Sequence, residues 1–308
     1  MIKTNVKIEC DEYIAEFRSD LGGNCYRLYH KGAETELLRS PENEEALKSS
    51  AFLYGNPILF PPNRIRGGEF EFEGRKYAFP INETKTNCHL HGTLHNTPFK
   101  ITERNESCVE FFYEAGSGEY LGFPHAFRLY RRYELSKNGL FERISVFNDS
   151  MANMPFMLAF HTTFNSPFIN EGDKCLMLVN VTEEHLRNEK YLPTGEVVGK
   201  RNREKLLNNG EYRIGAGRLS AFYGVHRSRA YVIDPKNGYK IAYDASEDYK
   251  YRMLWVKDGG SFSVIEPQTC AIDCFHLDTP ATENGLIVIP PGENIKLWTK
   301  ISLVEDKR

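Results

Sequence analysis

The chain has 308 residues, 39 basic and 42 acidic side chains and a formal net charge of −3, and its basic residues are scattered. This near-neutral balance excludes the electrostatic footprint of a nucleic-acid-binding protein, and no run of about 18 apolar residues predicts a membrane span. Seven cysteines at irregular spacings, and a first segment MIKTNVKIECDEY without the layout of a signal peptide, predict free thiols in a cytoplasmic protein.

The first 60 residues read mainly as strands. Aromatic residues make up 13% of the chain, and 24 glycines and 15 prolines punctuate it, a composition that favours strands over helices. Short alternating runs lie at residues 2–8, 13–17 and 25–29. Residues 40–50, SPENEEALKSS, are the first with helical character, because a Ser-Pro start precedes several charged residues. The prolines within residues 56–65, NPILFPPNRI, then exclude regular ladder pairing and predict an extended path.

Residues 69–79 predict a β-hairpin. Phenylalanines alternate with glutamates before Gly74, and aromatic residues resume an alternation after it, which is a strong short-range hairpin signal. Asn63 and Arg64 precede this hairpin, and His91 follows it in a Leu-His-Gly sequence. Because an antiparallel pair returns the chain close to its start, we expect Arg64 and His91 to lie near one another.

Strand patterns persist from residue 99 onward. The predicted strands lie at residues 108–113, 127–135, 141–148, 154–160, 230–233, 239–243, 252–256, 262–265, 285–290 and 296–304. The run 154–160 is continuously apolar, which predicts a strand covered on both faces. Residues 182–220 are the most polar part and predict loops, one Leu-Pro-Thr-Gly turn and one helical turn. Because we find no repeat, linker or low-complexity segment, we expect one domain over residues 1–308.

Two side chains at strand ends are candidates for acid/base chemistry. Glu266 ends the apolar run 262–265, and the following Pro267 restricts its backbone to an extended conformation. Desolvation at that position would raise its pKa towards the range of a general base, whereas the alternative is a rim carboxylate paired with an arginine. His161 ends the apolar run 154–160 and is either a proton donor or a satisfied core residue.

The segment 81–98 reads as a loop that contains His89, His91 and His95. A His-X-His sequence places two imidazoles on one side of an extended chain, which is compatible with a metal site. No carboxylate or cysteine stands at a complementary ligand spacing nearby, so we expect no metal. The chain also lacks a Gly-X-Ser-X-Gly nucleophile motif and a phosphate-binding glycine loop, so we expect no nucleotide cofactor.

Five motifs taken in order resemble the aldose 1-epimerase (galactose mutarotase) family. They are NRIRGGEFEFEGRKY, LHG, a histidine followed by TTFN, IEPQT and a PGE before the last strand. The resemblance extends from about residue 60 to the C-terminus. It implies an all-β fold, a large antiparallel β-sandwich (a galactose mutarotase-like super-sandwich) with few short helices and a sugar-binding cleft on one face. It also implies an isomerase that exchanges the α and β anomers of an aldohexose without a cofactor.

The resemblance also implies roles for individual residues. Glu266 matches the base that takes the proton of the anomeric hydroxyl, and His161 matches the acid that protonates the ring oxygen. Anomer exchange needs such a pair, because one group must remove a proton from O1 while another donates one to the ring oxygen. The residues expected to bind the sugar are Asn63, Arg64, His91 and Trp255, the last as an aromatic floor of the cleft.

The sequence departs from the family at two places and leaves alternatives open. Residues 219–222, LSAF, stand where family members carry a sugar-binding aspartate, and Thr93 replaces the second glycine of an LHGG doublet. One alternative is a hexose 6-phosphate 1-epimerase. Its cationic pocket would draw on Arg66, Arg252 and Lys257. The other alternative is a sugar-binding or sensing protein without turnover, and for each function we expect a monomer or homodimer.

Overall fold

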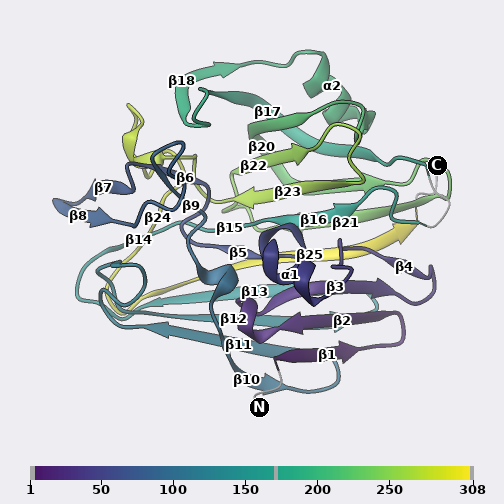
Figure 1. Ribbon diagram of the computed structural model, residues 1–308, viewed down its shortest axis with the longest axis horizontal. Coiled ribbons are helices and arrows are strands. Elements are labelled where there is room, and N and C mark those ends of the chain that lie inside the picture. Colours follow the sequence, from purple (N-terminus) through teal and green to yellow (C-terminus); the bar gives the residue numbers. More distant parts are fainter. Residues whose placement is uncertain (1–3, 170–172, 306–308) are drawn as a thin grey trace.

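The computed structural model describes residues 4–169 and 173–305 (Figure 1). Its first four strands form one antiparallel sheet in chain order. They are β1 (Asn5–Glu9), β2 (Tyr13–Arg18), β3 (Asn24–His30) and β4 (Thr35–Glu36). Alternate residues of β1 and β2 are buried, as expected for strands with one face on the core. The meander predicted at the start of the chain is therefore confirmed.

A second, larger antiparallel sheet contains fifteen of the described strands. They are β5 (Ile58–Leu59), β10 (Lys100–Arg104), β11 (Cys108–Ala115), β12 (Phe127–Ser136), β13 (Gly139–Asn148), β15 (Ala159–Phe160), β16 (Thr162–Asn165), β17 (Leu176–Arg187), β18 (Pro193–Val198), β19 (Tyr212–Arg213), β20 (Leu219–Ile233), β21 (Tyr239–Ala245), β22 (Tyr251–Val256), β23 (Phe262–Gln268) and β25 (Asn294–Glu305). Its main path runs β10-β11-β12-β13-β25-β21-β20-β22-β23-β15-β5, and β17 lies beside β20.

Three short strand pairs and two α-helices complete the described structure. The pairs are β6 (Arg64–Arg66) with β9 (Cys88–Leu90), β7 (Glu69–Phe72) with β8 (Arg75–Ala78), and β14 (Met154–Phe156) with β24 (Ile287–Ile289). The pair β7–β8 confirms the predicted hairpin. The helices are α1 (Glu44–Ser49) and α2 (Asn202–Asn209). No helix in the described ranges, α1 and α2 included, is long and apolar enough to cross a membrane.

The N-terminal sheet packs on the β11–β12 part of the large sheet through aromatic rings. The ring centre of Phe17 in β2 lies 4.6 Å from that of Tyr133 in β12 and 5.9 Å from that of Phe111 in β11, and all three side chains are buried. Figure 1 shows β1 to β3 beside β10 to β13, with β17, β20, β22 and β23 on the far side of β25. The predicted large antiparallel β-sandwich with few short helices is confirmed.

A buried polar network fixes the segments that lead into the candidate site. Arg131 Nε donates to Glu142 Oε1 at 2.6 Å, and both side chains are almost fully buried. The backbone carbonyl of Asn56 accepts a hydrogen bond from Arg131 at 2.6 Å. The side-chain amide of Asn56 donates to Glu142 Oε2, also at 2.6 Å. The hydroxyl of Thr162 donates to Asn56 Oδ1 at 2.5 Å. The chain before β5 and the chain after His161 are thus joined by one network of satisfied buried groups.

Three predictions made from local patterns are wrong in detail. The run 154–160 is fully buried, as predicted, but it divides into β14 and β15, which belong to different sheets. Strand β5 pairs with β15 despite the prolines on either side of it, because those prolines flank the paired residues and remove no donor from the ladder. Helix α1 begins after Asn43, whose side chain accepts the N–H of Ala46, and not at the Ser-Pro start.

Segments predicted to be loops contain regular structure. Residues 182–220 include the end of β17, all of β18, α2 and the start of β20. Along β17, buried Met177, Val179 and Val181 alternate with partly exposed neighbours, so its polar residues are those of an outward face. The loop predicted at 81–98 includes β9. Polarity marked the exposed face of strands here and was mistaken for irregular structure.

Candidate active site

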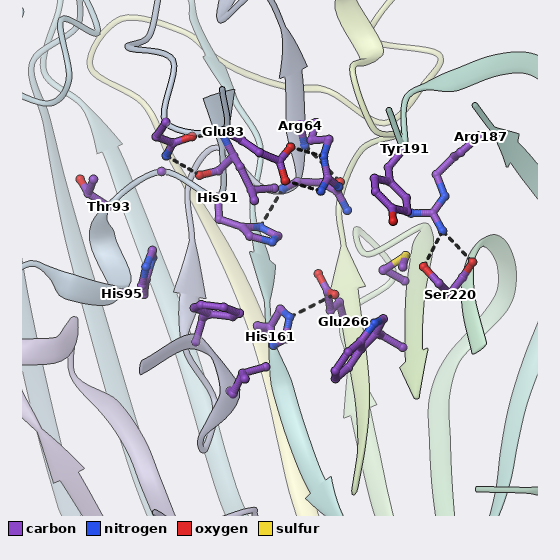
Figure 2. Close-up of a pocket in the computed structure, with 18 of the residues that line it drawn as sticks. Arg64, Glu83, His91, Thr93, His95, His161, Arg187, Tyr191, Ser220 and Glu266 are labelled. Carbon is purple, nitrogen blue, oxygen red and sulfur yellow. Dashed lines mark hydrogen bonds and ion pairs between the residues drawn. The ribbon is translucent and has the colours of Figure 1, made fainter. Parts of the chain in front are cut away.

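One cavity of about 530 Å³ is lined by all six residues that the sequence analysis selected (Figure 2). They are Asn63, Arg64, His91, His161, Trp255 and Glu266. Strands β6 and β9 pair with Arg64 opposite Leu90, which brings Arg64 and His91 together as predicted. Strands β22 and β23 supply Trp255 and Glu266. The cavity therefore lies where the hairpin-flanking strands meet the large sheet, and the roles of the six residues remain predictions.

Glu266 and His161 face each other inside this cavity. Nε2 of His161 lies 3.6 Å from Oε1 of Glu266. Glu266 pairs with Met253 across β22 and β23, and the backbone N–H of His161 donates to the carbonyl of Pro57 at 3.0 Å. Their exposed fractions are only 3% and 6%. Within residues 4–169 and 173–305 no arginine lies within ion-pair distance of Glu266, so the alternative of an arginine-paired rim carboxylate is wrong.

Burial moves the pKa values of this pair in opposite directions. Loss of solvent raises the pKa of Glu266 to about 8, although the charges of Arg187 and Arg64 act the other way. Burial lowers the pKa of His161 to about 4. At neutral pH the pair therefore holds one proton, and this proton resides on Glu266. Glu266 Oε2 and His161 Nδ1 are buried without a hydrogen-bond partner in the described structure.

Arg64 and His91 are oriented by fixed partners. Nε and Nη2 of Arg64 donate to the two carboxylate oxygens of Glu83 at 2.6 and 2.7 Å. The backbone N–H of Asn63 donates to Nδ1 of His91 at 3.1 Å. Burial, together with nearby His161, lowers the pKa of His91 well below its usual value. Because Nδ1 accepts a hydrogen bond, the neutral ring carries its proton on Nε2, which makes His91 a hydrogen-bond donor.

Gly92, next to His91, approaches the backbone of Phe60 closely, and its replacement tests the importance of this contact. Gly92 has φ +61°, and a Cβ there would overlap the carbonyl oxygen of Phe60. We expect Gly92→Ala to destabilise the fold by about 3 kcal/mol, from the positive φ and the overlap together. Gly67→Ala is the matched control, because Gly67 has φ +64° with no atom within 4 Å of its Cβ, and should cost about 1 kcal/mol. Equal losses in thermal melting would show that the close approach to Phe60 is unimportant.

The structure describes the two positions, Thr93 and Ser220, at which the sequence departs from the family motifs. Thr93 has φ −131°, a conformation open to any residue, so the position does not require glycine. Ser220 lies in β20 and lines the cavity, and Nη2 of Arg187 donates to its carbonyl at 2.7 Å and its hydroxyl at 3.0 Å. A guanidinium group therefore lies where the resemblance predicts a carboxylate.

The three histidines considered as metal ligands do not act together. His89 Nδ1 lies 2.7 Å from the carbonyl of Pro80, and its ring packs 5.0 Å from that of Phe79, centre to centre. His91 and His95 line the cavity, and His89 does not. Across the part of the chain that the structure describes, no three His, Cys, Asp or Glu side chains form a group that would hold a metal ion.

The cations proposed from the sequence for a phosphate pocket lie elsewhere. Arg66 is half exposed and pairs with Asp273 at 3.3 Å, and Arg252 is buried with Nη2 donating to the carbonyl of Ser228 at 2.7 Å. Lys257 is exposed just beyond β22. None of the three lines the cavity. That part of the phosphate hypothesis is wrong.

Sequence reasoning missed several cavity residues, four of which carry a charge or a phenol group. They are Glu83, Arg187, Tyr191 and Arg218. The last three come from the polar stretch that was interpreted as loops. The alternation of Met177, Val179 and Val181 breaks after Val181, so it does not lead to Arg187 at the end of β17.

Known proteins resemble the chain along most of its length. The family model described as aldose 1-epimerase matches residues 9–302. A galactose mutarotase-like protein from Clostridium acetobutylicum superposes with a TM-score of 0.90 at 27% identity, covering 98% of this chain and 95% of that one. A GalM/aldose epimerase homologue from C. elegans, at 15% identity and 98% coverage of both chains, shares the fold with a TM-score of 0.79. The uncharacterized protein YphB of Escherichia coli (strain K12) is 23% identical over 268 residues, 84% of this chain and 86% of YphB.

Proposed function

Because this chain belongs to the aldose 1-epimerase family, we propose that it interconverts the α and β anomers of an aldohexose by acid/base-catalysed ring opening. The observation that carries the proposal is the buried pair of Glu266 and His161, 3.6 Å apart and sharing one proton at neutral pH. Both groups also keep a free buried polar atom. Such a pair supplies an acid and a base to one substrate at the same time.

The proposed reaction begins with the cyclic sugar bound across the pair. Glu266 removes the proton of the anomeric hydroxyl, so that the O1–H bond breaks and the C1–O1 double bond forms. The bond between C1 and the ring oxygen breaks, and His161 donates a proton to that oxygen. Rotation about C1–C2 then presents the other face of the aldehyde, and the same steps in reverse close the ring. No electron is transferred, and one proton moves in each direction.

The resting proton position suits the ring-closing half of this cycle. With the proton on Glu266 and His161 neutral, the pair is ready to protonate the aldehyde oxygen and deprotonate the open-chain hydroxyl. The ring-opening half uses the other arrangement, in which His161 holds the proton. The two arrangements contain the same number of protons, so the pair titrates as a unit and both halves require its singly protonated form.

Neighbouring side chains position the sugar in this scheme. Arg64 is fixed by Glu83 and presents remaining guanidinium donors to sugar hydroxyls, and His91 donates from Nε2. Trp255, half-buried in β22, offers an apolar face to the ring carbons. Phe52 also lines the cavity, and its ring packs edge-on against His161 with 5.5 Å between the ring centres.

The proposal is tested by polarimetry on freshly dissolved α-D-glucose and α-D-galactose. We expect the rotation to approach its equilibrium value at a rate proportional to the protein concentration, with the final rotation unchanged. Rates equal to those in buffer for both sugars, and also for α-D-glucose 6-phosphate, would contradict the proposed activity. Sugar binding in the absence of any acceleration would instead support a binding or sensing protein.

The pH dependence of kcat/KM should be bell-shaped. Below about pH 4 both groups are protonated and no base remains, whereas above about pH 8 both have lost their proton and no acid remains. We therefore expect a plateau between these values and a tenfold loss per pH unit on either side, because kcat/KM reports the free protein. Rates are measured after subtracting the buffer-catalysed reaction. A rate that stays constant up to pH 10 would exclude the proton on Glu266 as a requirement.

A further inference from the structure

Arg187 is a cation in the cavity without an anionic partner. It ends β17 and is half-buried, and its Nη2 donates to the carbonyl and hydroxyl oxygens of Ser220. Within the described residues no carboxylate lies within ion-pair distance of it. Burial and the charge of Arg64 lower the pKa of Arg187 to about 10, so it is still charged at neutral pH. Most of its five donors have neutral partners or none.

The charges around the cavity do not cancel. Arg64 is neutralised by its two contacts with Glu83. Glu266, with a pKa of about 8, is mainly uncharged at pH 7. Arg218, also at the cavity wall, has a described contact at 3.5 Å with the hydroxyl of Tyr191, and no described carboxylate pairs with it. Arg187 and the exposed Arg218 therefore stand on one side of the cavity without a paired carboxylate among the described residues. Glu184, at the wall of a smaller adjoining cavity, is itself paired with Arg201 and Arg203.

This positive side lies across the cavity from His161 and within electrostatic reach of Glu266, whose pKa the charge of Arg187 lowers. The sheet order is β17, β20, β22, β23, so Arg187 stands three strand spacings, roughly 14 Å along the sheet, from the strand of Glu266. In Figure 2, Arg187 and Ser220 lie to the right of Glu266, and His161 lies to its left. A sugar with its anomeric carbon at the pair would direct its opposite end towards Arg187.

The space beyond Arg187 is large enough for a substituent. An adjoining cavity of about 350 Å³ shares Arg187, Tyr191, Arg218 and Ser220 with the main cavity. Tyr191 is held in a tight turn, in which its N–H donates to the carbonyl of Asn188 at 2.9 Å. The centre of its ring lies 4.7 Å from the guanidinium carbon of Arg64 and 5.8 Å from that of Arg187. The ring of Tyr191 is therefore in contact with both arginines.

We propose that the substrate is an aldose with an anionic group, a phosphate monoester or a carboxylate, at the end remote from its anomeric carbon, and that Arg187 binds this group with Arg218 beside it. The orientation of the sugar rests on the proposed function, whereas the anion site rests on the unpaired charges. A neutral hydroxyl would displace water from Arg187 and still leave its charge unbalanced, which is costly in a half-buried site. An anion accepts two parallel hydrogen bonds from the guanidinium fork and removes this cost.

Binding calorimetry of the full chain with glucose 6-phosphate, glucuronate and glucose tests the proposal. We expect at least one anionic sugar to bind roughly 10- to 100-fold more tightly than glucose, and added NaCl to weaken only that binding. Preference for glucose 6-phosphate alone identifies a phosphate site, and preference for glucuronate alone identifies a carboxylate site. Equal affinities for all three sugars, or no binding of either anionic sugar, would overturn the proposal.

Variants separate a specific contact from general charge. Arg187→Met should bring the ratio of anionic to neutral affinity close to one, and Arg187→Lys should restore part of it by returning the charge without the fork. Arg213→Met is the control, because Arg213 is exposed on β19, contacts only the carbonyl of Lys174 among described hydrogen bonds, and lies outside both cavities. It should leave the ratio unchanged. An Arg187→Met protein that melts normally and keeps the full preference would overturn the assignment.

Failure of this inference and failure of the proposed function give different results. Calorimetry measures binding and needs no turnover. Preferential binding of an anionic sugar with no accelerated mutarotation would overturn the epimerase activity and keep the anion site. Accelerated mutarotation of glucose without preference for either anionic sugar would keep the activity and overturn the anion site.

Discussion

Glu266→Gln is expected to lower kcat for anomer exchange by a factor of about 10³, the order associated with loss of a general base. Glutamine preserves the size and shape of the side chain but cannot take the proton of the anomeric hydroxyl. We expect KM to change much less than kcat, because Arg64, His91 and Trp255 remain in place to bind the sugar. The measurement is the initial rate of mutarotation by polarimetry, corrected for the reaction in buffer.

Thermal melting separates this loss of activity from a loss of folding. The pKa of Glu266 is raised to about 8 in the folded protein, so the unfolded chain binds fewer protons between about pH 4.5 and 8 and stability falls as pH rises through that window. Glu266→Gln should therefore melt at a higher temperature than wild type at pH 7, and at a similar temperature near pH 4. A lower melting temperature at pH 7 would contradict the buried, unpaired position of Glu266.

Glu83→Gln is a matched carboxylate control in the same cavity. Its carboxylate binds Arg64 at 2.6 and 2.7 Å and lies outside the acid/base pair. We expect this variant to raise KM, because Arg64 is released, and to keep kcat within about tenfold of wild type. If Glu83→Gln and Glu266→Gln reduced kcat equally, the special role given to Glu266 would be contradicted.

His161→Gln is expected to lower kcat by roughly 10² to 10³, because glutamine donates a hydrogen bond to the ring oxygen but transfers no proton to it. The variant should also lose the acidic limb of the pH profile near pH 4, which belongs to His161 in this mechanism. The measurements are kcat and the pH dependence of kcat/KM by polarimetry.

His95→Gln distinguishes His161 from a neighbouring histidine. His95 is also buried at the cavity, and burial lowers its pKa to about 4 as well. We expect His95→Gln to retain the acidic limb and to change kcat less than His161→Gln does. If the acidic limb is lost in His95→Gln and kept in His161→Gln, the acid has been assigned to the wrong residue.

Local patterns predicted much of the fold because apolar and polar residues alternate along most of its strands. The hairpin β7–β8 and the strand pairs β20–β21 and β22–β23 lie where glycine and Asp-Pro turns separate alternating runs. The division of residues 154–160 was missed because a continuous apolar run carries no period that marks a break. Strand β17 was not predicted, and its end was interpreted as a loop because the residues from 182 onward are mostly polar.

The candidate site was predictable only where its residues adjoin strand ends or lie in family motifs. Arg64 and His91 flank one hairpin, so chain proximity leads to that pair. Glu266 and His161 follow apolar runs far apart in the sequence, and only the family motifs bring them together. Arg187 reaches the cavity through the order β17, β20, β22, β23, in which neighbours in space are distant in sequence. Such crossovers leave no local signal, and the charge of the cavity therefore emerged only from the structure.

The central claim is that Glu266 and His161 open and close the sugar ring. Its most direct test is two-dimensional ¹H NMR exchange spectroscopy of equilibrated sugars in D₂O. We predict that the protein increases exchange between the α and β anomeric protons of glucose, galactose or glucose 6-phosphate in proportion to its concentration. Exchange should fall to the buffer rate with Glu266→Gln, and C1 and C2 should keep their protons throughout. No enhanced exchange in any of the three sugars, or deuterium entering at C2, would contradict the claim.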